Sequence, residues 1–156
     1  YTSRFLTLTK GTGVINRIFH GYGKFEGEMD GRKNGALISM ATGKAVAFAI
    51  FNLQARGEMF VTHNDPVYEG MIVGLAPKPG DMIINVMKGK QLTNMRTQGT
   101  DENVVLTPVR QMSIAEQLSM LNTDEALEIT PKSLRLRKAI LNPNDRKKNE
   151  KSGTPL

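Results

Sequence analysis

The sequence contains 156 residues, of which 39% are hydrophobic and 23% are charged, a balance typical of a soluble globular protein that can bury a core. It has no cysteine, which excludes disulfide bonds and thiolate metal sites and favours a reducing compartment such as the cytoplasm. No apolar run approaches the roughly 20 residues that span a bilayer, so we expect no membrane segment. Because the chain begins with Tyr1, we expect a piece of a longer protein.

Positive charge is concentrated near the C-terminus. The net charge is +6, and residues 132–151 hold eight cations opposed by two carboxylates, which accounts for the whole net charge. Such clustering favours an anionic partner such as nucleic acid. For the last ten residues alone, a solvated tail is the alternative interpretation. The cations are Lys132, Arg135, Arg137, Lys138, Arg146, Lys147, Lys148 and Lys151.

The first thirty residues predict a helix end, a strand and a linker. Residues 1–9 fit the last part of a helix, because Lys10 supplies a cation at its C-terminus and Gly11 can take a left-handed conformation. Residues 14–19 are rich in strand-forming side chains. Residues 20–30 alternate glycine with aromatic and charged residues, which indicates a linker.

The middle of the chain predicts two hairpins. Residues 35–40 form a strand, and residues 44–50 return as its partner, with a short helix over residues 49–57 that ends at Gly57. A brief strand follows at residues 58–62. The second hairpin pairs residues 71–76 with residues 81–87 across a Pro- and Gly-containing turn.

Residues 87–102 form a long polar loop between predicted strands. Lys88, Lys90 and Arg96 supply positive charge, while Thr93 and Asn94 are among several hydrogen-bonding side chains. This chemistry suits a phosphate backbone. A solvated loop without a partner is the other interpretation.

The C-terminal third predicts a helix, a hairpin and a tail. Residues 103–110 suggest an edge strand interrupted by Pro108. Ser113 and Glu116 form a capping box that starts a helix reaching Leu121. Ile114, Leu118 and Leu121 share the apolar face of this helix, and Gln117 points away from it. Residues 127–130 and 133–138 predict two strands, the second with leucines toward the core and Arg135, Arg137 and Lys138 outward. Residues 142–151 suggest a frayed helix.

No motif for catalysis stands out. Neither Gly43-Lys44 nor Gly89-Lys90 belongs to a Walker A pattern, so nucleotide hydrolysis by this piece is not expected. His63 and Asp65 could belong to a catalytic or metal site, but their position beside Asn64 and Pro66 favours a structural turn. We therefore expect no catalytic and no metal-binding residues.

Five blocks of sequence occur in order along the chain: GRKNGALIS at residues 31–39, AVAFAIFNLQARGEMFV at 45–61, VYEGMIVG at 67–74, KGKQLTNMRTQGTDE at 88–102 and EITPKSLRLRK at 128–138. Together they resemble the C-terminal region of the BipA/TypA family of bacterial translational GTPases. The first 22 residues resemble the end of the ferredoxin-like domain V of elongation factor G and its relatives.

The resemblance implies an α+β fold, with a strand-rich mixed C-terminal domain that has one or two short helices and follows the end of a ferredoxin-like domain. It divides the chain into a domain V remnant at residues 1–27, a family-specific domain at 28–141 and a basic tail at 142–156. The GTP-binding domain, with its GTP and magnesium, would lie in an absent N-terminal part. This piece is accordingly expected to be no enzyme and to hold no cofactor.

The resemblance also implies a function. The piece would bind the ribosome, contact ribosomal RNA and the acceptor end of A-site tRNA, and serve translation under stress and ribosome biogenesis as a cytoplasmic monomer. The alternative is a protein–protein interaction module without direct RNA contact, which would use the surface of residues 47–60.

The resemblance places RNA contacts on two segments, with further candidates elsewhere. Gln91 replaces a lysine that the family usually has, which should weaken one phosphate contact. The expected contacts are Lys88, Lys90, Gln91, Thr93, Asn94, Arg96, Lys132, Arg135, Arg137 and Lys138, and the further candidates are Arg32, Lys33, Arg146, Lys147 and Lys148.

Overall fold

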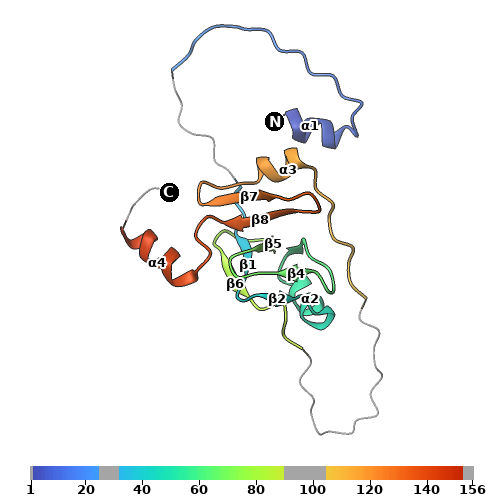
Figure 1. Ribbon diagram of the computed structural model, residues 1–156. Coiled ribbons are helices and arrows are strands. Elements are labelled where there is room, and N and C mark those ends of the chain that lie inside the picture. The colour runs from blue at the N-terminus through green and yellow to red at the C-terminus, as the bar shows by residue number, and fades with distance from the viewer. Residues whose placement is uncertain (1, 25–31, 90–104, 153–156) are drawn as a thin grey trace, which may run out of the picture.

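The computed structural model describes residues 2–24, 32–89 and 105–152 and shows an α+β fold (Figure 1). Its central sheet has the strand order β3-β5-β1-β6. The central strand β1 pairs antiparallel with β5 and parallel with β6. Two smaller sheets pair β2 with β4 and β7 with β8. The strands are β1 Ala36–Ser39, β2 Gly43–Lys44, β3 Glu58–Met59, β4 Pro66–Val67, β5 Ile72–Leu75, β6 Met82–Ile84, β7 Glu125–Ile129 and β8 Leu134–Lys138.

Both faces of the central sheet are buried, which explains why every residue of β1 is buried. Leu37 of β1 joins one hydrophobic cluster with Ile50 of helix α2 (Ala47–Gln54) and Val73 of β5. Ile38, the next residue, joins a second cluster with Leu136 of β8. Because successive strand side chains point to opposite faces, the helix α2 covers one face and the β7–β8 hairpin covers the other.

Four helices are present in the described residues: α1 Thr2–Leu8, α2 Ala47–Gln54, α3 Ile114–Ser119 and α4 Pro143–Ser152. The predicted end of α1 is confirmed, since Lys10 and Gly11 both have positive φ, at 52° and 81°. The capping box of α3 is also confirmed: the Glu116 N–H donates to Ser113 Oγ, and the Ser113 N–H donates to the Glu116 carboxylate. No helix in these parts of the chain is long and apolar enough to cross a membrane.

Neither hairpin predicted in the middle of the chain forms. Residues 44–50 enter helix α2 from Ala47, three residues after the short strand β2, which pairs with β4. β6 lies beside β1 because the chain crosses over the start of β1 after leaving β5. At the crossing, the Gly35 N–H donates to Lys78 O at 2.9 Å, and a Cβ on Gly35 would lie 1.8 Å from Gly80 O. A glycine is therefore required there.

The strands predicted at residues 14–19 and 103–110 are also absent from their described residues. Val14 and Ile18 are 80% and 93% exposed, so their apolar character marks no packed strand here. At residues 105–110, the Gln54 side-chain amide takes the place of a neighbouring strand. It donates to Thr107 O at 3.0 Å and accepts from the Thr107 N–H at 3.2 Å.

The side chains that helix α3 buries differ from those predicted. Gln117 was expected to point to solvent but is only 8% exposed, and its Nε2 donates to Met112 O. Ile114 and Leu118, expected on the core side, are half-exposed, whereas Leu121 packs against the second cluster. The residues on either side of the helix, Met112 and Leu121, therefore hold it against the second cluster.

Candidate nucleic-acid interface

The β7–β8 hairpin carries most of the predicted C-terminal contacts. Its strands pair in register from Glu125 with Lys138 to Ile129 with Leu134, joined by the Pro131-Lys132 turn. Arg135 lies opposite Glu128, and its Nη1 approaches the Glu128 carboxylate at 3.4 Å. This partly exposed pair leaves Arg135 able to exchange its carboxylate for a phosphate.

Arg137 and Lys132 flank that pair on the hairpin. The guanidinium of Arg137 donates to the backbone oxygens of Lys138 and Ala139 at 3.1 and 3.4 Å, so it is held near the end of β8. Lys132, in the turn, is exposed and has no hydrogen-bond or ion-pair partner among the described residues. The hairpin thus offers three cations, at its turn, its middle and its end.

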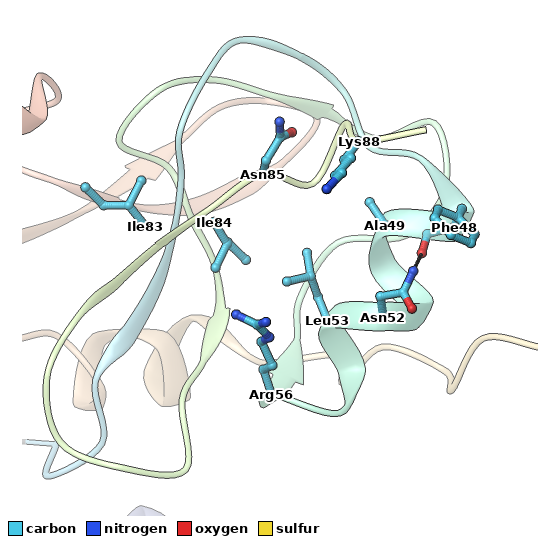
Figure 2. Close-up of a pocket in the computed structure, with 9 residues that line it drawn as sticks. All are labelled: Phe48, Ala49, Asn52, Leu53, Arg56, Ile83, Ile84, Asn85 and Lys88. Carbon is cyan, nitrogen blue, oxygen red and sulfur yellow. Dashed lines mark hydrogen bonds between the residues drawn. The ribbon is translucent and has the colours of Figure 1, made fainter. Parts of the chain in front are cut away.

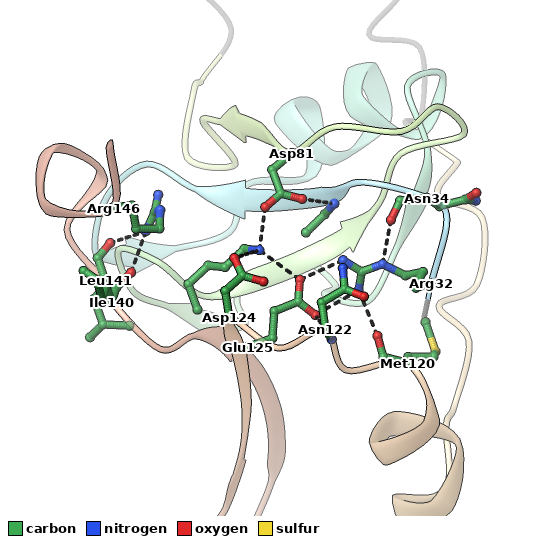
Figure 3. Close-up of polar contacts among 12 residues, drawn as sticks. Arg32, Asn34, Asp81, Met120, Asn122, Asp124, Glu125, Ile140, Leu141 and Arg146 are labelled. Atoms are coloured by element: carbon green, nitrogen blue, oxygen red, sulfur yellow. Dashed lines mark hydrogen bonds and ion pairs between the residues drawn. The ribbon is translucent and has the colours of Figure 1, made fainter. Parts of the chain in front are cut away.

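Lys138 does not point outward as predicted. It is 2% exposed, and its ammonium lies 2.5 Å from Asp81, 2.7 Å from Asp124 and 3.0 Å from Glu125. Figure 3 labels these three acidic residues. The alternation of β8 explains the error, because Lys138 falls on the same face as Leu136. The ammonium has three N–H donors, and three carboxylates already accept from it, so no donor is left for a phosphate.

Arg32 also belongs to this buried network rather than to an exposed turn. Its side chain is 7% exposed and forms a two-pronged ion pair with Glu125, at 2.7 and 3.2 Å. Further bonds run to the backbone oxygens of Asn34 and Met120. The carboxylate of Glu125 is fully buried between Arg32 and Lys138, which joins the entrance of β1 to the hairpin (Figure 3).

The network shifts the pKa of Lys138 and the pKa of Asp81 toward their charged forms. Burial lowers the pKa of Lys138, but its hydrogen bonds to Asp124, Asp81 and Glu125 outweigh burial, so that its pKa is raised. Burial likewise raises the pKa of the Asp81 carboxyl, and the hydrogen bonds from Lys138 and the Ala36 N–H more than offset it, so that this pKa is lowered. Both groups therefore stay ionised across the neutral range.

Tyr68 closes the hairpin against the sheet with another strong polar contact. Its O–H donates to Glu128 Oε2 at 2.6 Å. Burial, followed by this hydrogen bond, raises the pKa of Tyr68 to about 12. Glu128 thus serves both Tyr68 and Arg135, which fixes the position of Arg135 on the hairpin surface.

Helix α4 holds the predicted tail cations. Arg146 is used locally, since it donates to the backbone oxygens of Ile140 and Leu141 just before the helix. Lys148 forms an exposed pair with Asp145 at 3.3 Å, which is worth little in water. Lys147 is exposed without a partner among the described residues.

The remaining predicted contacts are dispersed. Lys33, beside Arg32, is exposed and has no partner in the part of the chain that the structure describes. Lys88 lies beyond β6, next to the cavity under α2, away from the hairpin cations. The expected contacts Lys90, Gln91, Thr93, Asn94 and Arg96 lie outside the described residues.

The cation Arg56 was not among the predicted contacts. Arg56, two residues beyond the end of α2, is exposed and lines the same cavity as Lys88. Its signal was a cation placed directly before Gly57, where a helix was expected to end. Only the fold brings it across from Lys88.

Comparison with known proteins agrees with the architecture. A family model described as the TypA/BipA C-terminal domain matches residues 34–143, which include all eight strands and helices α2 and α3. The chain belongs to the TypA/BipA family. The resemblance inferred from the sequence blocks is thereby confirmed.

Individual TypA/BipA relatives match over more of the chain. The chain is 47% identical to the large ribosomal subunit assembly factor BipA of Buchnera aphidicola subsp. Schizaphis graminum, over 100% of its own length and 26% of that protein. It is 46% identical to proteins of the same name from Salmonella typhimurium and Escherichia coli K12, over 95% of its own length and 24% of theirs. It therefore spans about a quarter of the length of these relatives.

The TypA/BipA match covers both the buried network and the exposed hairpin. Arg32 lies just outside the matched range, whereas its partner Glu125 and the other network residues fall within it. The match also contains the cavity lined by Arg56 and Lys88. The surface cations of the hairpin and the cavity therefore lie within the matched family domain, whereas Lys33 and the α4 cations lie outside it.

Proposed function

We propose that the chain is a docking module for the RNA of the large ribosomal subunit. The observation that carries the proposal is the separation of charge. The carboxylates of Asp81, Glu125 and Glu128 are engaged by Lys138, Arg32 and Arg135 within the fold. Among the predicted contacts, four exposed lysines have no partner in the described residues: Lys33, Lys88, Lys132 and Lys147.

Such a surface suits a phosphate backbone. Lysines that neutralise phosphates release condensed counterions, and this release drives binding without any need for sequence recognition. The names of the relatives, large ribosomal subunit assembly factors, support the choice of the large subunit as the source of this RNA. Arg135 and Arg137 on the hairpin add planar guanidinium groups that pair with phosphate oxygens.

The finer assignment follows from the family. We propose that Lys88, Lys90, Gln91, Thr93, Asn94 and Arg96 form the main RNA contact and that it reaches the acceptor end of A-site tRNA. The parent protein would be a GTPase whose GTP and magnesium are bound by a domain outside this chain. Lys138 and Arg32 are left out of the proposed contacts because their charges are used internally.

Ribosome co-sedimentation tests the proposal. Replacing Lys88, Lys90 and Arg96 together by alanine should abolish most binding to isolated large subunits. Three lost phosphate contacts should also reduce the slope of log affinity against log salt by about 2 to 3 units. The matched control replaces the exposed Lys24, Lys44 and Lys78, which removes the same charge elsewhere.

Two results would count against RNA docking. Unchanged co-sedimentation of the Lys88, Lys90 and Arg96 variant would exclude that segment as the main contact. Binding that does not respond to salt would instead favour the protein-interaction alternative. Within residues 47–60, Phe51 is the large hydrophobic side chain that the structure exposes, at 50%, which is a small surface for a protein partner.

A further inference from the structure

A cavity of 340 Å³ lies between helix α2 and strand β6. Figure 2 shows Ala49, Leu53 and Ile84 directed into it from the two elements, so its floor is apolar. Its volume is at the lower end of the range of about 300–1,000 Å³ for small-ligand pockets. A cavity of this volume can accept a ligand of about the size of one nucleotide.

Two cations enter this cavity from different sides. The guanidinium of Arg56 comes from the chain after α2, and the ammonium of Lys88 comes from the chain after β6 (Figure 2). Neither has an ion-pair partner among the described residues, and none of the nine lining residues is acidic. The site therefore favours an anionic ligand.

Polar groups at the rim have unused hydrogen-bonding capacity. Asn52 donates through Nδ2 to Phe48 O at 2.8 Å, so its Oδ1 remains an acceptor. Asn85 accepts the Met87 N–H through Oδ1 at 2.9 Å, so its Nδ2 remains a donor. One spare acceptor and one spare donor match the mixed edges that nucleobases present.

We infer that this cavity holds one unstacked nucleotide of a single-stranded segment of ribosomal RNA. The base rests on the apolar floor beside the Phe48 ring, and the phosphate lies between Arg56 and Lys88. The inference rests on the proposed RNA docking and adds a site for a single base to a surface that otherwise contacts phosphates. A phosphate alone would leave the apolar floor unused.

Nuclear magnetic resonance can test the site on the 156-residue chain. Adenosine 5′-monophosphate should shift the backbone amide signals of residues 48–56 and 83–88, while adenosine and inorganic phosphate at equal concentration should shift them less. A single-stranded RNA octamer should shift the same signals at lower concentration, because neighbouring phosphates add contacts.

Matched variants test the contacts to the phosphate and to the base separately. Arg56→Gln should weaken nucleotide binding about tenfold, as expected for a lost charged hydrogen bond, while Arg17→Gln outside the cavity should not. Phe48→Ala should weaken binding by a similar factor through lost stacking. Phe51→Ala, on the same helix but not in the cavity, is its control.

Several outcomes would overturn the inference. If inorganic phosphate shifts these amide signals as much as adenosine 5′-monophosphate does, the site binds anions without recognising a base. If the monophosphate shifts them but the RNA octamer does not, the site binds a free nucleotide and not RNA. If large subunits bind the chain but nucleotides leave these amides unshifted, the cavity fails while RNA docking stands. If subunits do not bind the unsubstituted chain, the proposed function itself fails.

Discussion

The alternation of side chains along β8 places Lys138 on the buried face of that strand, although it was predicted to point outward. Leu134 and Leu136 alternate toward the core, and Lys138 continues the same face of β8. The surrounding basic residues instead suggested an outward side chain. What the sequence could not reveal is that Asp81, some sixty residues earlier, and the Asp124-Glu125 pair supply the compensating charge. A buried ammonium is tolerated only with such partners.

Replacing Lys138 should therefore destabilise the fold. Lys138→Met leaves carboxylates near an apolar side chain, and removal of one partner of a buried ion network costs about 3 kcal/mol or more of unfolding free energy. Urea denaturation followed by circular dichroism measures this loss. Lys132→Met, in the exposed hairpin turn, is the control and should change stability by less than about 0.5 kcal/mol. Equal stability of both variants would mean that the network adds nothing.

The lowered pKa of Asp81 predicts a dependence of stability on pH. Because the unfolded carboxyl binds protons more readily than the folded one, its contribution is present above its ordinary pKa of about 3.9 and is lost as pH falls through the lower folded value. Unfolding free energy should thus decline in that acidic window. Asp81→Asn should be less stable at neutral pH and should lose less stability on acidification. A steeper acid loss in Asp81→Asn would contradict the assignment.

At the scale of elements, two signals from neighbouring residues were confirmed, whereas the pairings predicted for the strands of the central sheet were wrong. The α3 capping box and the hairpin around Pro131-Lys132 depend on residues close in sequence, and both are present. The parallel pairing of β1 with β6 depends on a crossover of about forty residues, and no local pattern encodes it. In the same way, Arg56 and Lys88 become neighbours of one cavity only after α2 packs against β6.

The described segment 105–110 shows how a side chain can take the place of a strand. Gln54 makes two hydrogen bonds to the backbone of Thr107, in the manner of a ladder partner. We expect Gln54→Ala to speed hydrogen exchange of the Thr107 amide by about fivefold or more, because the lost bond is worth about 1 kcal/mol or more. Gln111→Ala should leave that exchange rate unchanged. Continued protection of the amide in Gln54→Ala would show that other contacts hold the segment.

At the scale of the whole molecule, the central sheet and the hairpin are joined at one tight backbone contact. The Lys138 N–H donates to Gly70 O at 2.9 Å, and Gly70 itself has a φ of +83°. A Cβ at this position would lie 2.7 Å from the Leu141 Cα and 2.8 Å from the Leu141 oxygen. The contact lies beside the buried ion network, so both the polar and the backbone connections between the two sheets meet in one region.

Substitution of Gly70 should therefore loosen the hairpin from the sheet as well as strain the local backbone. Gly70→Ala should lower the unfolding free energy by about 2 kcal/mol or more, since it combines an unfavourable positive φ with a clash against backbone that cannot move aside cheaply. Gly80 is a matched control, because it has a φ of +98° but a Cβ added to it would meet no atom within 4 Å. Gly80→Ala should cost about 1 kcal/mol, the backbone part alone. If urea denaturation gives equal losses for the two variants, the close approach of Gly70 to Leu141 contributes nothing, and the hairpin is held to the sheet by its side chains.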